Sequence, residues 1–532
     1  MSGRKRLILG LVLGLFWGFA PLPASVGVLF AADDGMDTEI RKTDRPDAPE
    51  LAGASAWINA EKPVTIADLK GKVVLLDFWT FGCINCMHVI PDLKKLEEKY
   101  GKELAVIGVH SAKFSNEKST ENIRKAAQRY GLEHPIANDN GFKIWDSYGV
   151  SSWPTLVLID PSGKFLGRVG GEGNYEILDK YIAHTIKIFD EKKLIDRTKT
   201  IGKPEKLVTP VLKFPGKIIA QDKRLYIADT KNSRILIASP DGLVSEVIGN
   251  GKEAMADGSF EAASFHMPQG LALSGDKLYV ADCENHAIRR IDLKQKTVET
   301  IAGTGKQVYS NAGGPAKTTP LNSPWDLALS PDGKLMYIAM AGDHRIWQMD
   351  LEKNTVDILA GNGHENVVDG PFAAASFAQP SGLSLSGDIL YEADSEGSAV
   401  RALDLKKKTV STLIGYPSNE RALFIFGDVD GKYGTAQLQH ALAVLFHEGI
   451  LYVADTYNDK IKIIDPKALT AATFLGDGKP GKDDGKAPRF YEPGGLAIME
   501  GKLYIADTDN HLIRAADLKT KTVTTVPIRM KP

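Results

Sequence analysis

Apolar positions along the chain follow two different periods. Residues 73–79 form an almost unbroken apolar run between two glycines, which is typical of a buried strand. After Cys83, apolar residues recur at helical spacing as far as Leu96. The pattern therefore predicts a strand, a tight turn and a helix, with the sequence Cys-Ile-Asn-Cys at the start of the helix.

The same alternation continues to residue 190. Further strands are expected at residues 104–110, 155–160 and 165–169, and further helices at residues 120–130 and 175–189. We expect the first two strands to be parallel and the last two to form an antiparallel hairpin. The fold class predicted for residues 51–190 is an α/β domain.

Beyond residue 206 the pattern changes to short strands in a repeat. Six stretches resemble one another, such as LYIADTKNSRI from Leu225 and LYIADTDNHLIRAAD from Leu503, and they recur at intervals of 52 to 61 residues. Each repeat holds four short strands, which predicts an all-β, six-bladed β-propeller over residues 207–532. Residues 191–206 contain six lysines and arginines with a Gly and a Pro, and we expect them to be a solvated linker.

The first 32 residues differ from the rest of the chain. A basic group at residues 4–6 precedes an apolar run at residues 7–19, which predicts a secretory signal peptide over residues 1–32. An uncleaved membrane anchor formed by residues 7–30 is the alternative, because the apolar stretch continues that far. In either case we expect an exported protein, periplasmic or extracytoplasmic, with an unstructured acidic leader at residues 33–50.

The cysteines of the Cys-Ile-Asn-Cys sequence are the strongest candidates for chemistry. A helix start offers free N–H groups and partial positive charge, which favour a thiolate at Cys83. Cys86 lies one turn further on and can bridge to Cys83, so the pair can act as a redox-active disulfide. The alternatives are half of a zinc site or two structural thiols. A zinc site would need two more ligands, and the remaining cysteine, Cys283, is distant in the sequence.

Two further residues complete the predicted catalytic set. Asp77 lies inside the apolar strand, where it could accept a proton from Cys86 during resolution of a mixed disulfide; a carboxylate at the solvated end of the strand is the alternative. Pro154 precedes the third strand and suits a cis bond that turns the chain toward the cysteines. His88 and His110 are expected to be structural.

Charge and composition narrow the possible partners. The net charge of −2 gives no argument for nucleic acid or for an anionic membrane surface. The sequence contains no Gly-rich phosphate loop, no Ser nucleophile elbow and no paired metal-binding motif, so we expect neither a cofactor nor a metal. The expected partners are a protein thiol or disulfide and a protein bound by the propeller.

Three columns of polar residues recur in the propeller repeats. An Asp column could hold a cation, but an Asp that ends a strand more often hydrogen-bonds the following turn, here through the Asn or Gly three residues on. A His column could bind a metal only if its members converged, and an Arg column is expected to pair with the Asp column or to face solvent. The columns are Asp229, Asp282, Asp394, Asp455 and Asp507; His286, His344 and His511; and Arg289, Arg401 and Arg514.

Residues 51–190 resemble the thioredoxin superfamily, particularly the exported thioredoxins that serve cytochrome maturation. The family's buried acid, two cysteines, helix proline and cis-proline correspond to Asp77, Cys83, Cys86, Pro91 and Pro154. Two departures stand out, since Gly82 replaces the Trp that commonly precedes the first cysteine and Ile84-Asn85 replaces the usual Gly-Pro or similar pair. The intervening pair tunes the reduction potential in that family.

The propeller repeats resemble NHL repeats, and residues 510–512 read Asn-His-Leu. The whole arrangement is similar to the NHL-repeat-containing thioredoxin-like proteins. The leading hypothesis is an exported thiol–disulfide oxidoreductase whose propeller serves as a docking platform for a protein. Two alternatives stay open: a metal-dependent lyase in the propeller channel with an accessory thioredoxin domain, and an interaction scaffold whose cysteine pair is a structural disulfide.

Overall fold

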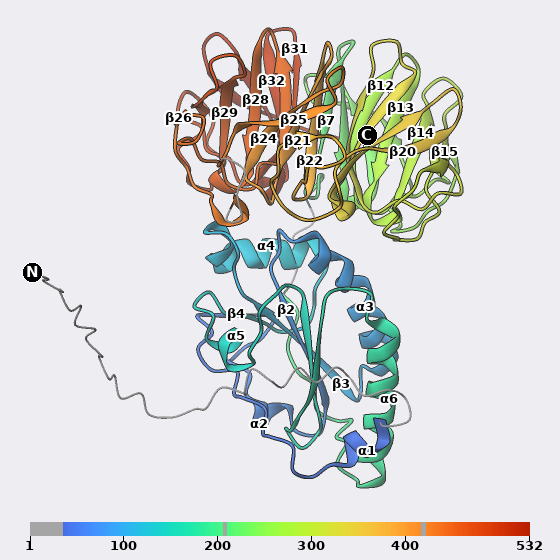
Figure 1. The fold of residues 1–532 in the computed structure, drawn as a ribbon, viewed down its shortest axis with the longest axis vertical. Coiled ribbons are helices and arrows are strands. Elements are labelled where there is room, and N and C mark those ends of the chain that lie inside the picture. Colours follow the sequence, from blue (N-terminus) through green and yellow to red (C-terminus); the bar gives the residue numbers. More distant parts are fainter. Residues whose placement is uncertain (1–35, 206–209, 417–421, 532) are drawn as a thin grey trace, which may run out of the picture.

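The computed structural model describes residues 36–205, 210–416 and 422–531. Figure 1 shows an α/β domain with a six-bladed β-propeller seated on it, and the expected fold class is confirmed. The predicted signal peptide or anchor at residues 1–32 lies outside the described residues. Within the described ranges, no helix is both long enough and apolar enough to cross a membrane.

The α/β domain is built on one six-stranded sheet with the order β1-β4-β3-β2-β5-β6. Its strands are β1 (Trp57–Ile58), β2 (Val73–Trp79), β3 (Leu104–His110), β4 (Ile136–Asn138), β5 (Thr155–Ile159) and β6 (Phe165–Gly170). The central strand β2 pairs in parallel with β3 and antiparallel with β5, and β5 and β6 form the expected antiparallel hairpin. Strands β1 and β4 escape the sequence pattern because they are only two and three residues long.

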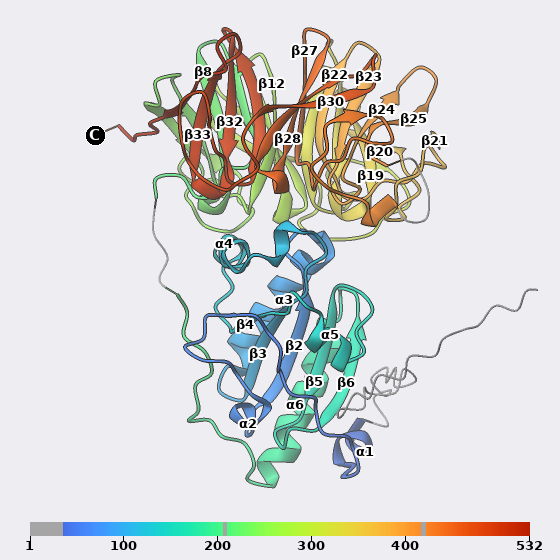
Figure 2. The ribbon, with the colours of Figure 1, turned by 90° about the vertical axis from the view of Figure 1, so that its left-hand side faces the viewer.

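Helices cover both faces of the sheet. They are α1 (Met36–Arg41), α2 (Ile66–Leu69), α3 (Ile84–Tyr100), α4 (Thr120–Tyr130), α5 (Lys143–Ser147) and α6 (Tyr175–Glu191), with a short 3-10 turn η1 (Asn116–Lys118) before α4. Alternate residues of β2 point to opposite faces, so Val73 and Leu75 pack in the cluster that contains α3 and α6 while Leu76 packs in the cluster that contains α5. Figure 2 shows α3 and α4 reaching up to the propeller.

The prediction of an unstructured leader is wrong for residues 36–50. Met36 and Ile40 on α1 are buried against α6, and the guanidinium of Arg45 forms a buried ion pair with Asp160.

The linker after α6 is bound to the α/β domain by backbone hydrogen bonds. The Asp196 N–H donates to the Gly71 carbonyl, and the N–H of residue 203 donates to the carbonyl of residue 59, each at 2.8 Å. The linker therefore runs back along the α/β domain.

The propeller consists of six antiparallel sheets, here numbered as blades in chain order. Blade 1 contains β7 (Ile218–Gln221), β8 (Arg224–Asp229), β9 (Arg234–Ala238) and β10 (Val244–Ile248). Blade 2 contains β12 (Pro268–Ser274), β13 (Lys277–Asp282), β14 (Ala287–Asp292) and β15 (Thr297–Ala302). Blade 3 contains β17 (Pro324–Leu329), β18 (Leu335–Met340), β19 (Arg345–Asp350) and β20 (Thr355–Ala360).

The remaining blades repeat this plan. Blade 4 contains β22 (Pro380–Ser386), β23 (Ile389–Asp394), β24 (Ala399–Asp404) and β25 (Thr409–Ile414). Blade 5 contains β27 (Ala443–His447), β28 (Ile450–Asp455), β29 (Lys460–Asp465) and β30 (Thr470–Leu475), and blade 6 contains β31 (Pro493–Met499), β32 (Lys502–Asp507), β33 (Leu512–Asp517) and β34 (Val523–Val526). Blades 2 to 5 each add a two-residue outer strand: β11 (Gly258–Ser259), β16 (Gly314–Pro315), β21 (Gly370–Pro371) and β26 (Gly431–Lys432).

Short 3-10 turns follow the second strand in five blades. They are η2 (Thr230–Asn232), η3 (Cys283–Asn285), η4 (Ala341–Asp343), η6 (Thr456–Asn458) and η7 (Thr508–Asn510), and a further turn, η5 (Ala422–Phe424), precedes β26. The ring is joined at its ends by the backbone of Arg529, which bonds Gly242 and Val244 of blade 1.

The Asp column holds the turn after the second strand, as its turn chemistry predicts. In blade 6, Asp507 accepts hydrogen bonds from the Tyr491 N–H at 2.8 Å, the Asn510 amide at 2.9 Å and the Arg514 guanidinium at 2.7 Å. The same Asp–Asn–Arg arrangement recurs at Asp282 in blade 2. The expected pairing of the Arg column with the Asp column is therefore confirmed in these blades.

The His column has a structural role that follows from backbone geometry. His286, His344 and His511 each adopt a left-handed conformation, and each accepts at Nδ1 a backbone N–H from the next blade at 3.1–3.2 Å. Burial lowers the pKa of His286 to about 3 and that of His511 to about 4, which keeps the accepting nitrogens unprotonated. These histidines join neighbouring blades.

The backbone N–H groups that donate to these histidines belong to a second column of residues. This column forms a ring at the end of the propeller that faces the α/β domain. We call it the mouth ring; its members are Phe214, Met267, Ser323, Gln379, His440 and Glu492. All six have φ between 46° and 64°, a conformation that costs a non-glycine residue about 1–2 kcal/mol. Their side chains are thereby directed at the α/β domain.

We expect Asp507→Ala to lower the Tm of the propeller by several degrees. The substitution removes one counter-ion of the fully buried Arg514, and breaking a buried pair costs about 3–5 kcal/mol. Calorimetry of the full chain measures the effect, with Thr524→Ala, an exposed position on the same blade, as the control. Equal Tm values for the two variants would contradict the structural role of the Asp column.

Candidate functional site

The two cysteines of the Cys-Ile-Asn-Cys turn occupy different environments. Cys83 is the N-cap residue of α3 and is half-buried, whereas Cys86 is buried in the first turn. Both are free thiols, and the Cys86 N–H donates to the Cys83 carbonyl at 3.1 Å. Burial, together with a hydrogen bond that the Cys86 thiol donates to the Cys83 sulfur, raises the pKa of Cys86 well above its ordinary value. The accessible thiol is therefore Cys83, and Cys86 is the inner one.

Asp77 lies under the cysteines in the middle of the sheet. Its side chain is buried on β2, and its Oδ1 has no hydrogen-bond partner among the residues that the structure describes. Burial raises the pKa of Asp77 to about 7, and its charge contributes to the raised pKa of Cys86. This position excludes the solvated strand end that was the alternative for this residue, and it brings a titratable carboxyl close to the inner thiol.

The Trp153–Pro154 peptide bond is cis, as the sequence indicates. The Trp153 indole donates to the Ser111 carbonyl at 2.9 Å and borders the apolar cluster that contains Cys86. Pro154 immediately precedes β5, the strand that pairs with β2 beside Asp77.

Glu117 is a site residue that the sequence does not reveal. Its buried carboxylate accepts hydrogen bonds from the Gly82 N–H at 3.0 Å, from the Thr80 hydroxyl at 2.6 Å and from two backbone N–H groups of its own loop. It thus fixes the turn that leads into Cys83 from inside the α/β domain. A single Glu in a polar loop gives no pattern by which this role could have been recognised.

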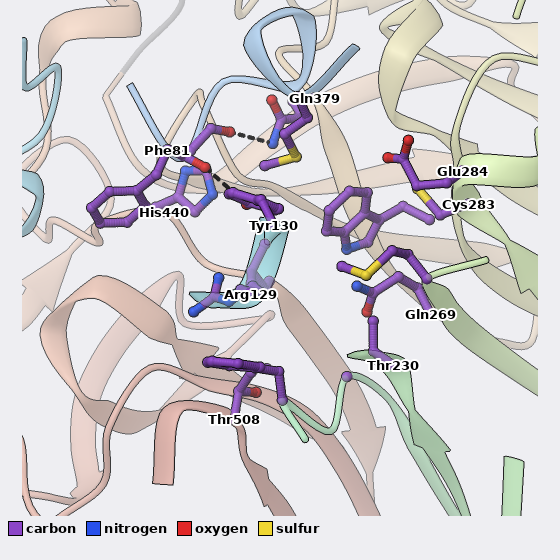
Figure 3. A pocket seen from close by; sticks show the side chains of 18 of the residues that line it. Phe81, Arg129, Tyr130, Thr230, Gln269, Cys283, Glu284, Gln379, His440 and Thr508 are labelled. Carbon is purple, nitrogen blue, oxygen red and sulfur yellow. Dashed lines mark hydrogen bonds between the residues drawn. The ribbon is translucent and has the colours of Figure 1, made fainter. Parts of the chain in front are cut away.

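The propeller holds the same turn from the other side. The amide of Gln379, a mouth-ring residue of blade 4, accepts from the Ile84 N–H at 2.8 Å and donates to the Gly82 carbonyl at 2.9 Å. Figure 3 shows this amide directed at the turn, beside His440 and Tyr130. Cys83 therefore lies between two backbone groups that a propeller side chain fixes.

The residues that depart from the thioredoxin pattern are the ones that the propeller contacts. A Cβ atom at Gly82 would come within 2.8 Å of the Tyr457 hydroxyl, so a Trp cannot occupy this position while the propeller is docked. Ile84 is buried in an apolar cluster with Cys283 of blade 2, and the Asn85 amide oxygen accepts from the Tyr309 hydroxyl at 3.3 Å. Cys283, although distant in the sequence, thus packs against the cysteine helix.

Ion pairs and polar contacts surround this apolar centre. Arg129 on α4 pairs with Glu492 of the mouth ring and with Asp509 of blade 6. His88, expected to be structural, is buried between Glu172 of its own domain and the hydroxyl of Ser323, whose Oγ lies 2.7 Å from Nε2. His110 is also buried as a structural group, since its Nε2 accepts from the Phe81 N–H at 3.3 Å.

A small cavity of about 50 Å³ lies where the α/β domain closes the propeller mouth (Figure 3). Behind it the buried Lys217 of blade 1 pairs with Asp326 of blade 3 and donates to the Leu442 carbonyl at the start of blade 5, so its side chain links three non-adjacent blades. Among the described residues no group of three or more His, Cys, Asp or Glu side chains could hold a metal ion. Within the part of the chain that the structure describes, the metal-dependent lyase hypothesis finds no ligand set.

Comparison with known proteins agrees with this architecture. The chain matches a thioredoxin-like family over residues 71–165 and the NHL repeat family over residues 265–291. It is 35% identical over 121 residues to the thiol-disulfide oxidoreductase ResA of Bacillus anthracis, a match that covers 23% of this chain and 68% of ResA.

Two relatives match nearly the whole chain. One is the chloroplastic protein SUPPRESSOR OF QUENCHING 1 of Arabidopsis thaliana, 43% identical over 502 residues; the match covers 91% of this chain but only about half, 48%, of the plant protein. The other is NHL repeat-containing protein 2 of Bos taurus, 42% identical over 558 residues. The expected periplasmic location is wrong in the light of these relatives, which are a chloroplast protein and an animal protein. Since the bovine match covers 95% of this chain and 77% of the relative, the chain belongs to the family of NHL repeat-containing protein 2.

Proposed function

We propose that this protein is a thiol–disulfide oxidoreductase. The observation that carries the proposal is the graded burial of the cysteine pair, with a half-exposed Cys83 at the start of α3 and a buried Cys86 above a buried carboxyl. Thiol–disulfide exchange needs one accessible thiolate and a second thiol near enough to resolve the mixed disulfide. The similarity to ResA, whose name states this activity, supports the same chemistry.

The reaction proceeds by two exchanges. The Cys83 thiolate attacks one sulfur of a protein disulfide, so that a bond forms between Cys83 and that sulfur while the other substrate sulfur leaves as a thiolate. Cys86 then attacks Cys83 in the mixed disulfide and releases the second substrate thiolate. The substrate gains two electrons and the Cys83–Cys86 pair becomes a disulfide; the reverse sequence oxidises a substrate dithiol.

Asp77 supplies a place for the proton of Cys86. A thiol whose pKa is raised by burial is a poor nucleophile until it is deprotonated, and a carboxyl with a pKa of about 7 is partly ionised at neutral pH.

In this proposal Pro154 shapes the contact with the substrate chain. The α/β domain of residues 51–190 carries the chemistry, and the propeller of residues 207–532 docks a protein partner.

Exchange of Cys83 to Ser is expected to abolish turnover of a protein disulfide in a dithiol-coupled assay. Cys86→Ser should leave the first attack intact and trap the mixed disulfide, which mass spectrometry detects. Cys283→Ala is the matched control, since this thiol packs behind the helix and takes no part in exchange. Undiminished turnover by Cys83→Ser would refute the proposal, and failure of the wild-type pair to exchange with glutathione would favour a structural disulfide.

Asp77→Asn is expected to stabilise the folded protein increasingly as the pH rises. The unfolded carboxyl titrates near its ordinary pKa of 3.8 and the folded one near 7, so between these values the unfolded chain binds fewer protons and wild-type stability falls with rising pH. Asn does not titrate. The Tm of the variant minus that of the wild type should therefore grow between pH 4 and pH 8.

The control for this measurement is Asp92→Asn, a partly exposed carboxylate on the same helix as the cysteines. The Tm difference of Asp77→Asn should grow more steeply with pH than that of the control, and equal slopes for the two variants would contradict the raised pKa of Asp77. In the dithiol-coupled assay, Asp77→Asn should slow resolution and so accumulate the mixed disulfide.

A further inference from the structure

The Gln379 side chain makes an unusual two-point contact across the reactive cysteine. Its amide bridges the residue before Cys83 and the residue after it, and the amide group is fully buried. The backbone N–H of Gln379 is itself held by His344 at 3.2 Å, and its φ of 64° aims the side chain at the turn. The bridge is therefore rigid at its propeller end.

The bridge places a partial negative charge where a thiolate would otherwise be stabilised. The Ile84 N–H belongs to the first residue of α3, and the free N–H groups of a helix start provide the positive potential that favours an anion there. Gln379 Oε1 takes up this N–H, and the Cys83 side chain makes no capping hydrogen bond to the helix. The docked propeller thus offsets part of the positive potential by which a helix N-terminus favours the thiolate form of a cysteine.

Blade 4 also neutralises Lys113, a cation whose charge interacts with Cys83. Lys113 is buried in the loop after β3, where Glu396 and Glu365 of blade 4 pair with its ammonium group. These two carboxylates, with a lesser contribution from Cys83, raise the pKa of Lys113. The charge of Lys113 is therefore engaged mainly by the propeller, and little of it remains to favour a thiolate at Cys83.

We propose that Gln379 is a positioning residue through which the propeller holds the Cys83–Cys86 pair in a more reducing state than the α/β domain alone would give. This inference rests on the proposed oxidoreductase function and adds a regulator to it. A less stable thiolate makes the dithiol form less favoured relative to the disulfide, which lowers the reduction potential. A partner that separated blade 4 from α3 would make the pair more oxidising.

The test uses the full-length chain with Gln379→Leu and Gln379→Met, which remove the amide dipole while keeping the bulk of the side chain. Alkylation of Cys83 by iodoacetamide at pH 7, mapped by mass spectrometry, should become about tenfold faster. The equilibrium with glutathione should move about tenfold toward the dithiol, which corresponds to about 30 mV for a two-electron couple.

Two further variants separate this effect from loosened docking. Ser323→Ala changes another mouth-ring residue, one that contacts the same helix at His88 rather than at the cysteine turn, and it should leave both readouts unchanged. Gln379→Glu can still accept from the Ile84 N–H, whether or not its carboxyl is ionised, so its Cys83 should react no faster than that of the wild type.

Equal potentials for the wild type and the two apolar variants would overturn the inference, as would an equal change in Ser323→Ala. A faster reaction of Gln379→Glu would also overturn it, since the negative end of the side chain is retained there. These outcomes differ from failure of the proposed function itself, which would appear as a wild-type cysteine pair that does not exchange with glutathione at all.

Discussion

The first turn of α3 is completed by hydrogen bonds from two domains. Glu117 holds the Gly82 N–H from within the α/β domain, and Gln379 holds the Gly82 carbonyl and the Ile84 N–H from the propeller. Together these bonds hold the backbone on both sides of Cys83. The mouth ring, the ion pairs of α4 and the apolar contacts of Ile84 all serve to keep the two halves of this turn together.

This shared turn gives a physical reason for the departures from the thioredoxin pattern. In the thioredoxin pattern a Trp commonly precedes the first cysteine. Here Gly82 lies against Tyr457 and His440, and the space for a larger residue is filled. The docking contacts have therefore replaced the usual residues around the cysteines, while the buried acid and the cis-proline remain in place.

Sequence reasoning succeeded where the determining contacts are local. The six blades, the β2–α3 connection and the hydrogen bond that an Asn donates to the column Asp three residues before it, as Asn510 does to Asp507, all follow from short-range patterns. It failed for α1, where only Met36 and Ile40 reveal a helix within an acidic segment. It also failed for Glu117 and Gln379, since nothing near either residue in the sequence shows which backbone groups it holds.

The dependence of the cysteine turn on the mouth ring has a consequence during synthesis. The α/β domain emerges first from the ribosome, but the ring is complete only when blade 6 joins blade 1 through Arg529. At about 5–20 residues per second, the intervening chain takes tens of seconds to make. Throughout that interval the Cys83 turn and the apolar side chains of Ile84 and Met87 lack the propeller contacts that cover them. The nascent chain is thus most open to unwanted disulfides, and most in need of a chaperone, before its last blade closes.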